Sequence, residues 1–88
     1  MKIRVTPQCL EIMNIHAEES FPEECCGFML GKEEPNGIRY IEEVYKISNS
    51  KEENRKRRYL IEPGQHLKAE RYAREKHLDI LGVYHSHP

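Results

Sequence analysis

The sequence predicts a three-layer α/β/α sandwich, in which helices cover both faces of a mixed β-sheet. Two observations support this fold class: strand-like and helical patterns alternate along the chain, and the two helical segments flank a pair of strands joined by a tight turn. A third observation is size, because 88 residues are enough for one small domain with a modest core. The expected order of elements is β-α-β-β-β-α-β.

The chain begins with a short strand and an amphipathic helix. Residues 2–6, KIRVT, alternate weakly between polar and apolar side chains, as a short strand does. Thr6 followed by Pro7 is typical of a helix start, with threonine as the N-cap and proline at the first helical position. Apolar residues then recur at helical spacing over residues 8–20, which predicts one helix.

A hairpin follows this helix. Residues 24–32, ECCGFMLGK, form a short apolar run bounded by charge, which is typical of a buried strand. The Asn-Gly step at 36–37 is a strong hairpin-turn signal. The chain then returns as a second strand over residues 38–48, where the glutamate pair at 42–43 interrupts the pattern and predicts a bulge.

The C-terminal half supplies a loop, a helix and a final strand. Residues 49–58 are polar and charged and predict an exposed loop, and RYLIE at 58–62 is a candidate third strand. Pro63 opens a segment rich in helix formers that should remain helical to about His77. Residues 79–85, DILGVYH, are apolar and predict a last strand in the centre of the sheet.

Charge and composition exclude several functional classes. The 14 Lys and Arg nearly balance the 15 Asp and Glu, for a net charge of −1, so no global field favours nucleic acid or an anionic membrane. The basic run RKRR at 55–58 has no interleaved aromatics and is interpreted as a solvated loop. No apolar run is long enough to span a membrane, and the N-terminus lacks the apolar core of a signal peptide. Three cysteines, two of them adjacent, form no disulfide framework, so a cytoplasmic location is expected.

Two histidines near the end of the chain suggest half of a metal site. His85 and His87 follow the apolar residues of the last expected strand, and strand residues two apart point to the same face. Their imidazoles can converge on one zinc ion at about 2.0–2.1 Å each, while Ser86 points the other way. The alternative is a solvent-exposed, histidine-rich terminus without metal.

The remaining candidates do not complete a zinc site that needs three protein ligands. Asp79 is the only aspartate, and along an extended strand it lies about 20 Å from His85. Of Cys25 and Cys26, at most one could face the metal, because adjacent strand residues face opposite sides. The other histidines fall on expected helices and have no spacing relation to the pair: His16, His66 and His77.

FPEECCGFMLG at 21–31 and GVYHSHP at 82–88, taken together, resemble the JAMM or MPN-type zinc metalloproteases, in particular their small bacterial and archaeal branch. The resemblance covers essentially the whole chain. It implies the cytidine-deaminase-like fold of that family, and a single JAMM/MPN-like domain over residues 1–88 that is incomplete, or truncated, at its C-terminus.

The resemblance also implies a role for each matching residue. The family's motif is a glutamate, then His-x-His-Pro, then a Ser-x-x-Asp a short distance on. Carried over, His85 and His87 bind Zn²⁺, and Glu24 is the catalytic general base, with Glu23 as the less favoured register. The serine and the aspartate have no counterpart in residues 1–88, so these residues alone are expected to bind zinc poorly and to be inactive.

The activity implied is hydrolysis of an amide or isopeptide bond. The expected substrate is the C-terminal tail of a ubiquitin-like or sulfur-carrier protein, docked in extended form beside a strand edge. Neither nucleic acid nor a membrane is expected as a partner, and a homodimer is left open. The alternative from another class is a non-catalytic interaction or scaffold module of the MPN type.

Overall fold

The computed structural model describes residues 2–47 and 61–87. These residues form one four-stranded sheet with the strand order β1-β3-β2-β4 and two helices. β1 runs parallel to β3, whereas β2 is antiparallel to both β3 and β4, which confirms the predicted mixed sheet. The elements are β1 (Lys2–Val5), α1 (Pro7–Ser20), β2 (Cys26–Glu33), β3 (Ile38–Ile47), α3 (Pro63–Glu75) and β4 (Asp79–His85).

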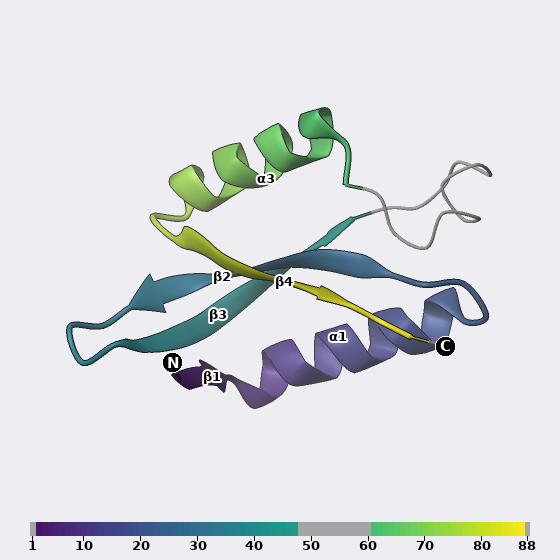
Figure 1. Cartoon of the computed structure of the whole chain (residues 1–88), viewed down its shortest axis with the longest axis horizontal. Coiled ribbons are helices and arrows are strands. Elements are labelled where there is room, and N and C mark those ends of the chain that lie inside the picture. Colours follow the sequence, from purple (N-terminus) through teal and green to yellow (C-terminus); the bar gives the residue numbers. More distant parts are fainter. Residues whose placement is uncertain (1, 48–60, 88) are drawn as a thin grey trace.

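The two helices lie on opposite faces of the sheet, so the predicted three-layer sandwich is confirmed (Figure 1). Phe28 and Leu30 are two residues apart on β2, so their side chains lie on the same face of the sheet, the one covered by α3. There they pack in the main core cluster with two residues of α3, Ala69 and Ala73. α1 covers the other face, where its Cys9 is only 2% exposed. Side chains of β2 point alternately to the two faces of the sheet, so this strand contributes to the packing against both α3 and α1.

Both helices begin as the sequence predicts. The Thr6 hydroxyl accepts a hydrogen bond from the Cys9 backbone N–H at 3.1 Å, and Pro7 occupies the first turn of α1. α3 ends at Glu75, and its predicted extension to about His77 is wrong. His77 has φ +58°, a left-handed conformation that stops the helix.

The hairpin and its bulge are confirmed. Gly37 has φ +84°, and its N–H donates to the Glu34 carbonyl at 2.8 Å to close the turn between β2 and β3. The pairing of β2 with β3 slips by one residue beside Leu30, in the region where the glutamate pair at 42–43 predicted a bulge.

The predicted central position of the last strand is wrong. In the described part of the chain, β4 pairs only with β2 and lies at one edge of the sheet (Figure 1). Its apolar residues reflect the helices above and below it and carry no information about its lateral neighbours. The candidate strand at 58–62 and the loop at 49–58 fall largely outside the described residues, and Ile61 and Glu62 are not in a strand. No helix within 2–47 and 61–87 is long and apolar enough to cross a membrane.

Candidate metal centre

The pairing of β2 with β4 brings the two ends of the candidate site together. His85, the last residue of β4, pairs with Cys26, the first residue of β2. Two hydrogen bonds extend this pairing by one residue: Ser86 N–H donates to the Cys25 carbonyl at 3.0 Å, and Cys25 N–H donates to the Ser86 hydroxyl at 2.9 Å. The next pair along the two antiparallel segments is Glu24 and His87.

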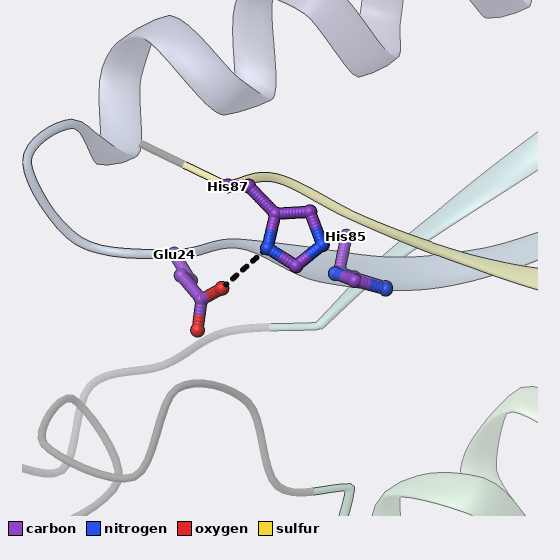
Figure 2. Close-up of side chains that lie close together, drawn as sticks. All are labelled: Glu24, His85 and His87. Atoms are coloured by element: carbon purple, nitrogen blue, oxygen red, sulfur yellow. Dashed lines mark ion pairs between the residues drawn. The ribbon is translucent and has the colours of Figure 1, made fainter.

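Glu24, His85 and His87 form one compact cluster (Figure 2). One potential ligand atom from each residue lies within 4.8 Å of the other two. Glu24 Oε1 is 3.4 Å from His87 Nδ1, and the two imidazole rings have centroids 4.4 Å apart at 80°. The structure thus brings together all three residues that the sequence singled out, and Glu24 rather than Glu23 belongs to the cluster.

The burial of the cluster is uneven. The Glu24 side chain is 13% exposed, whereas that of His87 is 71% exposed. Glu24 Oε2 is fully buried and, within residues 2–47 and 61–87, has no hydrogen-bond partner. A buried carboxylate oxygen without a partner is costly, so this atom favours a water molecule or a cation beside it.

The residues present fit a zinc ion. Two nitrogens and one oxygen are the donor types that zinc takes from proteins. Two atoms bound tetrahedrally at about 2.0–2.1 Å are about 3.4 Å apart. The ligand atoms of the cluster all lie within 4.8 Å of one another, and the 3.4 Å between Glu24 Oε1 and His87 Nδ1 matches this separation.

The opposite face of β4 is anchored to α1 immediately before the histidine pair. The Tyr84 hydroxyl lies 2.7 Å from His16 Nδ1, and its ring lies over Gly27, where a side chain would collide with it. Burial raises the pKa of Tyr84, and burial, with the nearby positive charge of Lys46, lowers the pKa of His16. Both side chains are therefore uncharged at neutral pH. Sequence reasoning missed this contact, because 68 residues separate its partners and no local pattern links them.

The other candidate ligands lie elsewhere or remain protonated. Asp79 is at the far end of β4, with its carboxylate 3.7 Å from Lys32 Nζ. His66 is on α3 and lies 3.2 Å from Glu70. Burial, together with neighbouring Cys25 and Glu24, raises the pKa of Cys26 to about 11, so its thiol stays protonated near neutral pH.

Comparison with known proteins agrees with this architecture. The family model for prokaryotic homologs of the JAB domain matches residues 6–88. The chain belongs to this family. A search of the curated proteins finds no match.

This prokaryotic JAB-domain chain also resembles solved structures. A protein from Desulfitobacterium hafniense is 30% identical with a TM-score of 0.82, and the match covers 98% of this chain and 57% of that one. A protein from Salinibacter ruber is 36% identical with a TM-score of 0.70, with coverage of 97% and 56%. The chain therefore spans a little over half the length of these two structures.

Proposed function

We propose that this prokaryotic JAB-domain chain supplies the zinc-binding part of a metallopeptidase that hydrolyses an amide or isopeptide bond. The observation that carries the proposal is the convergence of Glu24, His85 and His87. Glu24 precedes β2, His85 ends β4 and His87 follows it, and the antiparallel pairing of the two strands brings one largely buried carboxylate beside two imidazoles. A carboxylate next to two histidine donors is suited to hydrolysis assisted by a metal.

Each residue has a distinct role in this proposal. His85 and His87 would hold the zinc ion, which when bound makes a water molecule acidic enough to attack near neutral pH. Glu24 would accept a proton from the attacking water and later donate it to the leaving nitrogen. The position of its other carboxylate oxygen supports this role, because Glu24 Oε1 lies 3.4 Å from His87 Nδ1, beside the proposed zinc ligands.

The proposed substrate is the extended C-terminal tail of a ubiquitin-like or sulfur-carrier protein. The position of β4 supports this, because within residues 2–47 and 61–87 it is an edge strand, which offers backbone groups to an extended peptide, and it ends at His85. The serine and aspartate of the family motif have no counterpart in residues 1–88, so the activity is proposed for the full-length protein. The cytoplasmic location and the homodimer remain predictions.

Zinc content and peptidase activity of the full-length protein test the proposal. His85→Ala and His87→Ala should each abolish stoichiometric zinc binding. His66→Ala is the matched control, because His66 is also an exposed histidine beside a carboxylate, Glu70, but lies outside the cluster. Zinc retained by both cluster variants would exclude these histidines as ligands.

A second pair of variants separates catalysis from metal binding. Glu24→Gln should keep zinc but slow cleavage of a ubiquitin-like fusion by about 10²–10⁴-fold, because the amide cannot accept the proton. Glu23→Gln tests the neighbouring register and should leave cleavage unchanged. A wild-type protein that binds such a partner without zinc and without cleavage would favour the non-catalytic interaction module.

A further inference from the structure

β4 contains one residue more than the strand it pairs with. Leu30 of β2 pairs with Ile80, but the adjacent Met29 pairs with Gly82, so Leu81 is an extra residue in the ladder. Such a bulge changes which later residues of the strand face each side of the sheet.

The bulge lets β4 satisfy two requirements that a regular strand could not meet together. Ile80, before the bulge, packs against the core beneath α3. After the bulge, Tyr84 faces α1 and contacts His16, while His85 pairs with Cys26, a member of the α3-side core cluster. In a regular strand Ile80 and Tyr84 would share a face. With Ile80 in place, His85 would then point away from Glu24.

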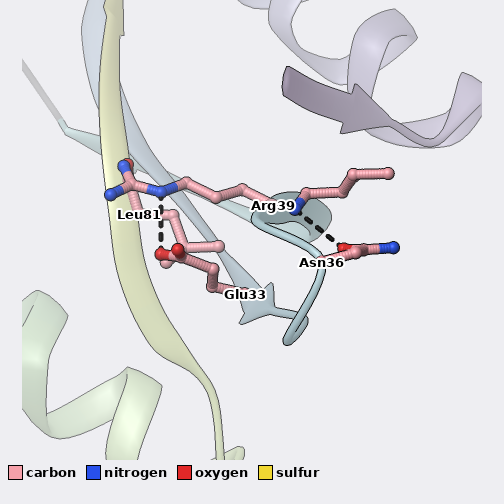
Figure 3. A network of polar contacts seen from close by, with 5 residues as sticks. Glu33, Asn36, Arg39 and Leu81 are labelled. Atoms are coloured by element: carbon pink, nitrogen blue, oxygen red, sulfur yellow. Dashed lines mark hydrogen bonds and ion pairs between the residues drawn. The ribbon is translucent and has the colours of Figure 1, made fainter. Parts of the chain in front are cut away.

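An arginine from another strand holds the bulge. Arg39 is on β3, and its side chain reaches across β2 to β4, where Nη1 donates to the Leu81 carbonyl at 3.0 Å (Figure 3). Its Nε donates to Glu33 Oε1 at 3.1 Å, which orients the guanidinium. The ladder is disrupted at a bulge, and a charged donor is a strong partner for the carbonyl there.

We propose that Arg39 is a positioning residue for the candidate metal centre. By binding the Leu81 carbonyl it keeps β4 bulged, and it thereby keeps His85 and His87 on the face of Glu24. Loss of this hydrogen bond shifts the balance between the bulged and regular strand by about tenfold towards the regular one. The link to metal binding rests on the proposed function. The phase of β4, meaning which face of the sheet each of its side chains takes after the bulge, does not depend on that function.

Nuclear Overhauser contacts in the full-length protein test the phase of β4 directly. The wild type should show backbone contacts between Cys26 and His85 and ring contacts between His16 and Tyr84. Arg39→Met keeps the aliphatic stem but removes the donor. It should weaken both contacts and create contacts between Cys25 and His85. Arg71→Met, at an exposed arginine of α3, is the control and should change neither.

A variant that lacks Leu81 has no bulge to hold, so it is the background in which the effect of Arg39→Met should disappear. Without this residue, the pairs Leu30–Ile80 and Met29–Gly82 become consecutive steps of a regular ladder, so the deletion should preserve the contact of Cys26 with His85. Arg39→Met should then have no effect on the strand. The zinc affinity of Arg39→Met should likewise fall, by up to about tenfold, in the wild-type background and be unchanged in the deletion background.

Each outcome decides the proposal. Arg39→Met with the contact of Cys26 and His85 intact would overturn it, and so would a Leu81 deletion that loses this contact. If Arg39→Met unfolds the protein, recovery in the deletion background supports the proposal, whereas unfolding in both backgrounds overturns it. A wild-type protein without zinc affinity would defeat the proposed function only, because the contacts still report the phase of the strand.

Discussion

Replacement of Gly27 by alanine should displace Tyr84 and with it the strand that carries His85. A Cβ atom built on Gly27 lies 2.5 Å from Tyr84 Oη and Cε1. Carbon atoms in ordinary contact are about 3.5–4.0 Å apart, so the ring must retreat by about 1 Å. The ring cannot do so freely, because its hydroxyl is held 2.7 Å from His16 Nδ1.

The expected cost follows from these contacts. Overpacking of this kind destabilises a protein by about 1–3 kcal/mol, and the strained hydrogen bond to His16 adds about 1 kcal/mol. Alanine recovers about 0.5–1 kcal/mol relative to glycine in the interior of a strand. The net loss for Gly27→Ala is therefore about 1–3 kcal/mol of unfolding free energy.

Urea unfolding of the wild type and Gly27→Ala measures this loss. Gly64→Ala is the control, because a Cβ on Gly64 meets no atom within 4 Å and should not destabilise α3. In a Tyr84→Val background the ring is absent, so Gly27→Ala should cost little. An unchanged midpoint for Gly27→Ala, or an equal loss in the Tyr84→Val background, would refute the collision as the cause.

Three further predictions concern the rest of the domain. Thr6→Ala should lower the unfolding free energy by about 1 kcal/mol through loss of the α1 cap, whereas Thr6→Ser should keep most of it, as measured by thermal unfolding. Leu30→Ala removes a fully buried side chain and should cost about 2–5 kcal/mol in urea unfolding, far more than Leu10→Ala at a half-exposed position. Burial lowers the pKa of His16 below its ordinary 6.5. The contribution of His16 to the unfolding free energy is therefore present above pH 6.5 and is lost as the pH falls through the lowered pKa of the folded state. Unfolding free energies from pH 7 to 5 should therefore fall less steeply in His16→Gln, and an unchanged slope would contradict this assignment.

Local signals were sufficient for much of the fold and for half of the candidate site. Thr6 with Pro7 predicted the start of α1, and the Asn-Gly step at 36–37 predicted the hairpin turn, because caps and turns depend on a few neighbouring residues. The shared direction of His85 and His87 followed from the two-residue repeat of a strand. The approach of Glu24 was expected only from a family resemblance, because no spacing rule connects residues so far apart.

Tertiary structure decided the lateral order of the strands and the support beneath the site. The apolar residues of β4 report the helices on its two faces, so they could not distinguish an edge strand from a central one. Two contacts join residues far apart in the sequence: His16 and Tyr84 are 68 positions apart, and Arg39 and Leu81 are 42 positions apart. Such contacts arise only once β4 has paired with β2 in one register, because register, and not the local pattern, determines which distant side chains meet.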